Sequence, residues 1–212
     1  MRKYVVEFIG MFFFVLLVGC TVIGPGAGPG ALLAPLAIGS VLMVMIYAGG
    51  HVSGGHYNPA VTLGVTLRGR CSWAEAPLYM ASQLFGAAVA SMVVKYLESK
   101  AKAPTPMTLD LGPAMVAEFL FTFALVWVVL NAATSKDTAG NSFYGLAIGF
   151  TVMVGAFSVG NISGGAFNPA IALGISLLNL TDIANLWVYW IPELLAGAAA
   201  AFTFNWVNPD DR

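Results

Sequence analysis

Two asparagines, Asn58 and Asn168, occupy equivalent positions in a ten-residue stretch that occurs twice. The first copy is HVSGGHYNPA at 51–60, and the second is NISGGAFNPA at 161–170, 110 positions further along. Glycines and apolar residues around the two copies recur at the same offset, so the chain contains an internal duplication. An amide side chain donates and accepts hydrogen bonds without gaining or losing a proton. The repeated residues therefore suit the binding of a neutral polar molecule.

Side chains that perform covalent chemistry are not clustered along this sequence. His51 and His56 are five positions apart, and no third residue with the spacing of a zinc ligand accompanies them. No nucleophile is paired with a base in a recognisable pattern. We therefore expect no catalytic activity, no bound metal and no cofactor.

The composition is that of a protein embedded in lipid. Of the 212 residues, 58% are hydrophobic and only 9% are charged, whereas soluble domains carry about 25% charged residues. The net charge of −1 offers nucleic acid no electrostatic attraction. We expect an all-α, multi-pass protein of the lipid bilayer.

The hydrophobic pattern predicts six full spans and two short helices. The full spans are expected at 4–23, 32–48, 73–97, 113–134, 143–159 and 183–204. The short helices, 58–67 and 168–178, each reach only about 15 Å, half of a bilayer. We expect a single domain over 1–212, with repeats at about 1–98 and 113–207 joined by a linker at about 98–112.

Each repeat has three spans, an odd number, so the second repeat must be inverted relative to the first. Inversion brings two re-entrant half-helices into the membrane from opposite faces, and their N-termini meet near the midplane. Each begins with Asn-Pro, a favoured helix cap followed by a favoured first residue. Pro59 and Pro169 fill the first helical positions, and Ala60 and Ala170 follow them.

The glycines before each motif favour irregular backbone, which membranes tolerate where it lines a wet cavity or is buried in protein. We expect Gly54, Gly55 and Gly164 to place carbonyl groups along a pore. The two helix N-termini, each equivalent to about half a positive charge, would repel cations and hydronium at its centre.

The basic residues favour an orientation with both termini in the cytoplasm. On that side lie six of them, Arg2, Lys3, Arg68, Arg70, Lys136 and Arg212, against three on the other. The compact chain suggests a prokaryotic plasma (inner) membrane.

The chain resembles the aquaporin (major intrinsic protein) family over essentially its whole length. The resemblance includes both Asn-Pro-Ala motifs, the Ser-Gly-Gly-His at 53–56, and Gln83 with Gly86. It implies six tilted helices plus two half-helices, a pore for water and small neutral solutes in each subunit, and a homotetramer.

The resemblance also assigns roles to three polar residues of the spans and loops. Glu7 and Glu118 would accept hydrogen bonds from the re-entrant loops, although both stand near span ends and alternatively reach the interface. His56 would line the pore, and the alternative is a histidine packed within its loop.

The sequence departs from the family at the outer selectivity filter. Its positions, carried over by spacing from the motifs, are Ile38, Ala156, Gly165 and Ile171. Family members usually have an arginine where this chain has Ile171. We therefore expect a wider and less polar filter that passes small uncharged solutes such as glycerol or urea as well as water.

Alternatives remain open at this point. Phe157, Phe167 or Tyr47 would make the channel water-selective by turning into the filter. An ion-coupled transporter also uses inverted repeats and broken helices, and a closed scaffold protein is a third possibility. Glu193, inside the last span, is a functional group, or pairs with a hydroxyl or amide at a helix interface, or lies nearer the membrane boundary.

Overall fold

The computed structural model describes residues 1–24 and 32–211, and within them six helices are long and apolar enough to cross a membrane. These are α1 (Arg2–Ile23), α3 (Ala34–Ser53), α5 (Ala76–Leu97), α6 (Leu111–Val129), α7 (Tyr144–Ser163) and α9 (Leu186–Val207). A π-helical turn, Leu130–Thr134, extends α6, and a 3₁₀ turn, Ile183–Asn185, precedes α9. Two short helices, α4 (Pro59–Leu67) and α8 (Pro169–Leu177), complete the architecture. The predicted all-α fold is confirmed.

The second and fifth spans are longer than the sequence predicts. The hydrophobic pattern predicts ends at 48 and 159, but α3 and α7 continue to Ser53 and Ser163. The helices end where Gly54 and Gly164 adopt left-handed backbone, with φ of 90° and 88°, a common helix termination. Gly49, inside α3, permits close packing: a Cβ there would lie 2.2 Å from the Tyr57 hydroxyl.

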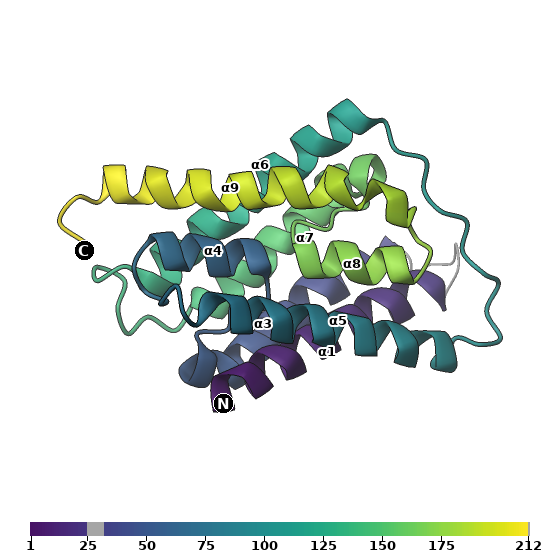
Figure 1. The fold of residues 1–212 in the computed structure, drawn as a ribbon, viewed down its shortest axis with the longest axis horizontal. Helices are drawn as coiled ribbons and strands as arrows, with labels where there is room; N and C mark the ends of the chain where they lie inside the picture. The colour runs from purple at the N-terminus through teal and green to yellow at the C-terminus, as the bar shows by residue number, and fades with distance from the viewer. Residues whose placement is uncertain (25–31, 212) are drawn as a thin grey trace.

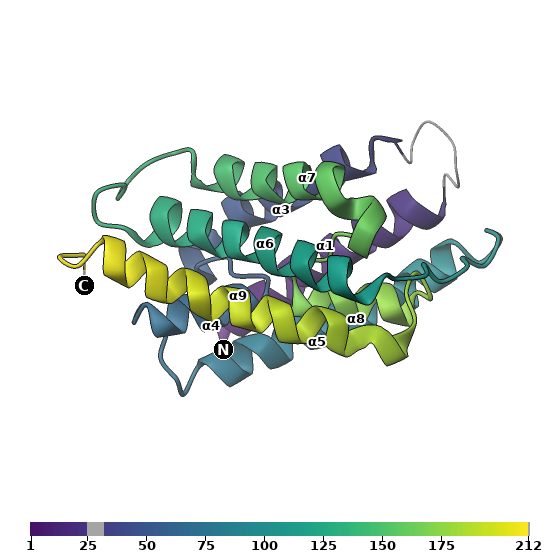
Figure 2. The ribbon, with the colours of Figure 1, turned by 90° about the horizontal axis from the view of Figure 1, so that it is seen from above.

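The half-helices α4 and α8 lie in line, and their N-termini face each other at the middle of the molecule (Figure 1). The full-length helices surround them, with α3 and α7 along one side (Figure 2). Each half-helix packs on the third long helix of the other repeat, α4 on α9 and α8 on α5. The two repeats therefore interlock through their half-helices.

Glycine contacts also join the repeats at the crossing of α3 and α7. A Cβ on Gly39 would lie 2.6 Å from the Gly149 carbonyl oxygen, and a Cβ on Gly149 would lie 2.5 Å from that of Gly39. Two helix backbones approach this closely only where side chains are missing. This crossing fixes one wall of the space around α4 and α8.

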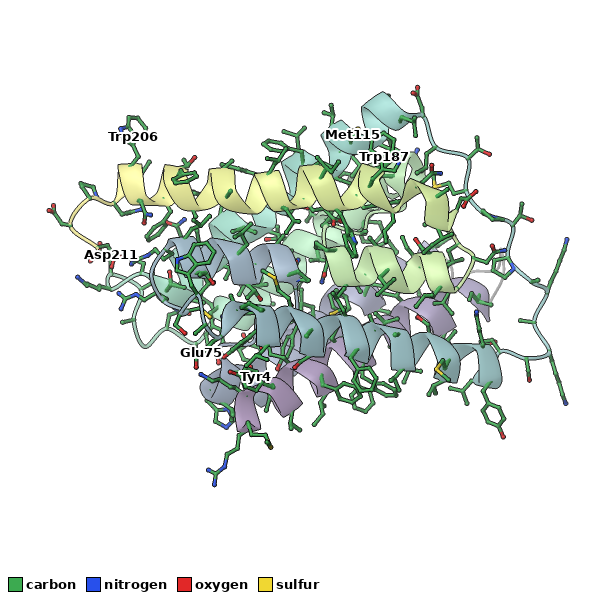
Figure 3. The ribbon with its side chains drawn as sticks, viewed as in Figure 1. Tyr4, Glu75, Met115, Trp187, Trp206 and Asp211 are labelled. Atoms are coloured by element: carbon green, nitrogen blue, oxygen red, sulfur yellow. The ribbon has the colours of Figure 1, made fainter. Side chains whose placement is uncertain are left out.

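Exposed tryptophans stand near both ends of α9. Trp206 points away from the bundle (Figure 3), and Trp187 and Trp206 are 46% and 82% exposed. They are 19 residues apart, which in a helix is about 28 Å, close to the thickness of the hydrocarbon layer. Tryptophan is enriched at both membrane interfaces, so α9 has the length and the ends of a membrane span.

An ionic cluster ties the end of α9 to the C-terminus of α4. The Arg68 guanidinium donates to Asp211 Oδ1 at 2.8 Å, and its plane lies over the Phe204 ring, 4.6 Å from the centroid. The backbone N–H of Lys136 donates to Asp211 Oδ2 at 3.1 Å. Asp211 lies at the same end of the bundle as Glu75 (Figure 3), which pairs with Lys3.

The Asp211 cluster gives a stability that depends on pH. A hydrogen bond from Ser135, the Lys136 N–H and Arg68 hold the pKa of Asp211 below its ordinary value. The ionised Asp211 carboxylate therefore stabilises the fold at pH values above the unfolded-state pKa of about 3.9. This contribution disappears as the pH falls through the lower pKa of the folded state. We expect Asp211→Asn to lower the melting temperature at pH 7. The difference from wild type should vanish near pH 2, as thermal denaturation in detergent would show; an equal difference at both pH values would contradict it.

Candidate functional site

The two asparagines of the repeated motif cap the half-helices. Asn58 and Asn168 have extended backbone, with φ of −166° in both. Asn58 Oδ1 accepts from the Ala60 N–H at 2.8 Å, and Asn168 Oδ1 accepts from the Ala170 N–H at 3.0 Å. Pro59 and Pro169 fill the first helical position, where no N–H is needed. The geometry is that of an N-cap at the meeting point of two helices.

The same side chains connect the two repeats. Asn58 Nδ2 donates to the Phe167 carbonyl at 2.8 Å, and Asn168 Nδ2 donates to the Tyr57 carbonyl at 2.8 Å. An amide nitrogen carries two hydrogens, so each asparagine has a second N–H. That of Asn168 has Met11 Sδ at 4.0 Å.

Tyr57 and Phe167 present these carbonyls from a backbone conformation unusual for aromatic residues. Their φ values are 43° and 49°, a region that bulky residues rarely adopt. Tight packing maintains them: a Cβ on Gly10 would lie 2.1 Å from the Tyr57 ring, and one on Gly155 would lie 2.6 Å from the Phe167 ring. The rings therefore fix the loop carbonyls that the asparagines require.

Two fully buried carboxyl groups hold the loops before the half-helices. Glu7 accepts from Ser53 Oγ at 2.7 Å and from the N–H groups of His56 and Tyr57 at 3.0 and 2.7 Å. Glu118 accepts from three groups at equivalent positions, Ser163 Oγ at 2.6 Å, Ala166 N at 3.0 Å and Phe167 N at 2.6 Å. Both side chains are 0% exposed, so neither reaches the membrane interface.

A cavity of about 360 Å³, here called the apolar cavity, lies on one side of the paired asparagines. Its wall brings together all four residues predicted for the filter, together with Gly164: Ile38 from α3, Ala156 from α7, Gly165 from the loop and Ile171 from α8. Its other lining residues are mostly aliphatic, and Thr105, Thr181 and Tyr189 contribute hydroxyl groups. Charged side chains are missing from this wall as far as residues 1–24 and 32–211 show.

A second cavity of about 710 Å³, the polar cavity, opens on the opposite side. His56, Ser53 and Gly54 line it together with charged side chains, Lys3, Arg70, Glu75 and Lys136. His56 Nδ1 lies 3.2 Å from the Thr62 hydroxyl, and the ring is tilted against Tyr79 at 4.9 Å between centroids. The histidine is therefore both packed and part of the cavity wall.

A third, much narrower space lies at the asparagines, between the two cavities, and is here called the narrow segment. Its volume is about 10 Å³, the space of one water molecule. Asn58, Asn168 and His56 line it. It shares Phe14, Val152 and Ala166 with the apolar cavity, and His56 and Val129 with the polar cavity. The narrow segment is therefore adjacent to both cavities.

Some residues singled out from the sequence pack instead of facing these spaces. Gly55 lies against Gly50 and Ile46 of α3. Ala60 and Ala170 are 0% exposed. The Ala60 carbonyl packs against Gly197, where an added Cβ would lie only 2.5 Å from the carbonyl oxygen. They set the close packing of α4 and α8, and they do not line the three spaces.

The aromatic residues that would close the filter point elsewhere. Phe157 is 56% exposed on the outside of α7. Phe167 packs between Gly155 and Phe121, and the Tyr47 hydroxyl donates to the Ser142 carbonyl at 3.0 Å. The apolar cavity is bounded without any of them.

Sequence reasoning missed several wall and support residues. Phe14 and Val152 line both the apolar cavity and the narrow segment, and nothing in their chemistry marks them. Tyr79 and Tyr189 were detectable, because they are separated by the same 110 positions as the motifs. Their hydroxyls donate to the carbonyls of Ser53 and Ser163 at 2.8 and 2.6 Å.

Comparisons with known proteins agree with this arrangement. The family model described as major intrinsic protein matches residues 1–204. The chain is 36% identical to Aquaporin NIP1-4 of Oryza sativa subsp. japonica, over 98% of this chain and 77% of that protein. It is 35% identical to Glycerol uptake facilitator protein-like 6 of Lactiplantibacillus plantarum, over the full length of both.

A solved structure has the same fold. The aquaglyceroporin from Plasmodium falciparum superposes with a TM-score of 0.79, covering 99% of this chain and 95% of that one at 22% identity. The matched family model extends over nearly the whole sequence, and both relatives exceed 30% identity. The chain therefore belongs to the major intrinsic protein family of membrane channels.

Proposed function

We propose that water and small uncharged solutes such as glycerol or urea cross the membrane through the apolar cavity, the narrow segment and the polar cavity. Family membership makes the protein a passive channel for water and small neutral solutes, and not an enzyme. The observation that carries the finer proposal is the wall of the apolar cavity, where Ile38, Ala156, Gly165 and Ile171 meet without a charged group among them.

The size and polarity of this wall support a solute larger than water. Ala156 and Gly165 occupy little volume, and Ile171 is fully aliphatic where an arginine would project a long charged side chain. The carbon chain of a solute such as glycerol can lie against Ile38 and Ile171 while the solute's hydroxyl groups reach loop carbonyls or Thr181. An apolar wall with a few polar groups is the usual design of a site for a small neutral molecule.

The centre supplies the barrier to ions. Cations entering the narrow segment lose water and meet two helix N-termini, each equivalent to about half a positive charge. Asn58 and Asn168 bring amide N–H groups to the same place, and these groups stabilise a neutral oxygen acceptor in passing. With Ile171 replacing the filter arginine, this centre is the channel's main cation barrier.

Assembly and orientation extend the proposal. We expect four copies to form a homotetramer with one pore in each subunit, as the family resemblance implies. The two termini lie toward the same end of the bundle (Figures 1 and 2), which is the end of Arg68 and Lys136. The positive-inside rule supports a cytoplasmic location for that end, and the bacterial relative supports a prokaryotic plasma membrane.

Proteoliposome flux measurements test this function. Stopped-flow light scattering with purified protein should show rapid osmotic water flow, followed by reswelling when glycerol or urea is the osmolyte. Empty liposomes provide the baseline, and a proton-sensitive dye trapped inside should report no added proton leak. Rapid water flow without glycerol or urea uptake would show that the filter is narrower than proposed.

A further inference from the structure

Glu193 of α9 occupies the position in the second repeat that Gln83 of α5 occupies in the first. The two are 110 positions apart, the same separation as Asn58 and Asn168. Both side chains are 0% exposed. Tyr79 and Tyr189, which precede them by four and belong to the same helices, make equivalent hydrogen bonds to Ser53 and Ser163. The duplication therefore sets an amide and a carboxyl group against equivalent loops.

In the first repeat the amide serves as a donor. Gln83 Nε2 donates to Glu7 Oε2 at 2.7 Å and also to the Thr62 hydroxyl at 3.0 Å. Glu7 thus accepts from four groups in total. A carboxylate that deep in the membrane requires such a complete set of partners.

In the second repeat two carboxyl groups meet. The N–H of Phe167 donates to Glu118 Oε2 at 2.6 Å, and the N–H of the next residue, Asn168, donates to Glu193 Oε1 at 2.8 Å. Neighbouring backbone amides therefore hold the two carboxyl groups side by side. The Glu118 and Glu193 side chains are near enough to interact, and Glu193 Oε2 is buried with no hydrogen-bond partner within the described ranges 1–24 and 32–211.

An ionised carboxylate only accepts hydrogen bonds, so a bond between two carboxyl groups requires a proton on one of them. The titratable groups that face the pair are the two carboxyls themselves and Tyr189 of α9. The helices packed on α9 bring no cation: α4 and α8 carry no titratable residue, and Glu118 is the one titratable residue of α6 between 111 and 129. Two adjacent negative charges without a counter-ion would repel strongly at this depth.

We propose that Glu118 and Glu193 share one proton, and that the Glu193 carboxylic acid replaces the Gln83 amide as the donor that positions the second half-helix. The acid bridges Glu118 to the N–H of Asn168 and so sets the cap that faces the narrow segment. Glu193 is a positioning residue, since it lies behind the asparagine and does not line the cavities. The shared proton does not depend on the proposed channel function, but its expected effect on solute flux rests on that function.

The shared proton makes solute flux through the channel sensitive to alkaline pH. Loss of the proton leaves two carboxylates in contact, which pushes the loop at 164–168 away from Glu118 and disturbs Asn168. Flux therefore falls as pH rises. Glu193→Gln restores a permanent donor in the manner of Gln83 and removes this dependence, whereas Glu193→Leu has no donor at any pH.

Infrared difference spectroscopy tests the proton directly and needs no transport. Wild-type protein in lipid should show the carbonyl stretch of a protonated carboxylic acid at pH 7, and the band should be missing from Glu193→Gln. The reciprocal variant Gln83→Glu builds a second carboxyl pair against Glu7 and should add a band. Absence of the band from wild type, or its persistence in Glu193→Gln, would overturn the proposal.

Flux and stability test the positioning role. We compare the rate of glycerol uptake at pH 7 with the rate at pH 10. The ratio of the two rates should be well above one for the wild-type protein and close to one for Glu193→Gln. Glu193→Leu should melt about 5 °C or more below Glu193→Gln at pH 7, since a buried carboxylate loses a donor. Equal melting of the two variants would contradict positioning by a donor. Wild-type liposomes without flux would contradict the proposed function instead, and the infrared band would still decide on the proton.

Discussion

Replacing Ile171 with arginine is expected to remove glycerol and urea uptake while water flow persists. Ile171 is 4% exposed and lines the apolar cavity together with Ala156 and Gly165. An arginine there adds length and a permanent charge to a cavity of about 360 Å³, and its guanidinium can reach the loop carbonyls that a solute would use. We expect glycerol permeability to fall about tenfold or more, in the range that steric exclusion from a pocket provides, in stopped-flow assays of proteoliposomes.

The matched control is Ile171→Met, which changes the shape of the side chain but keeps it apolar and similar in volume. This variant should retain glycerol uptake close to that of wild type. Both proteins should first be shown to be monodisperse by size-exclusion chromatography, so that misfolding is not mistaken for selectivity. Undiminished glycerol uptake by the arginine variant would mean that the apolar cavity does not select the solute.

Removing the Glu7 carboxyl group is expected to prevent accumulation of folded protein. Glu7→Ala removes the acceptor of four buried donor groups: Ser53 Oγ–H, the backbone N–H groups of His56 and Tyr57, and the Gln83 N–H that does not donate to Thr62. Each unpaired buried donor costs about 1–3 kcal/mol, so the loss exceeds about 4 kcal/mol. That is a large fraction of the 5–15 kcal/mol that typically separates folded from unfolded protein. Fluorescence-detected size-exclusion chromatography of a tagged protein measures the loss.

Two further variants make this result specific. Asp137→Ala removes an exposed carboxylate from a loop and should leave the yield unchanged. Glu7→Gln keeps one acceptor oxygen and should give an intermediate melting temperature. A yield of Glu7→Ala equal to that of Asp137→Ala would show that the loop before α4 does not depend on Glu7.

The element order and the centre of the molecule were accessible from sequence because the duplication repeats a strong local signal. Asn-Pro specifies a helix start through its side-chain acceptor and the missing N–H of proline, whatever surrounds it. Asn58 and Asn168 therefore cap helices where the pattern predicts. Long apolar segments are similarly insensitive to context, and the predicted full-length helices were found.

The ends of α3 and α7 were not accessible in the same way. In the sequence, the pair Gly49-Gly50 resembles the end of a helix. In the structure, Gly49 lies inside α3, and its missing side chain leaves room for Tyr57. The role of a glycine depends on which side chain approaches it from another helix. Glu193 shows the same limit, since its partner Glu118 becomes apparent only when α6 and α9 are packed together.

Part of the difference between the two sides of the centre comes from divergence between the duplicated halves. His56 and Thr62 of the first copy correspond to Ala166 and Ala172 of the second. One side of the centre therefore carries an imidazole and a hydroxyl, while the other carries methyl groups. The motif asparagines are shared, so the centre is common to both halves and the change falls on its two sides.

The reciprocal bonds between Asn58 and the Phe167 carbonyl, and between Asn168 and the Tyr57 carbonyl, have a consequence for how the protein is made. While a ribosome has delivered only the first hundred residues, α4 lacks both α9 and the carbonyl that its capping amide requires. A half-helix that spans half a bilayer and ends in unsatisfied donors cannot settle in lipid. We expect the nascent first half to stay exposed to water or bound by the insertion machinery until α8 and α9 are synthesised. Assembly of the pore is then one of the last steps in the biosynthesis of the protein.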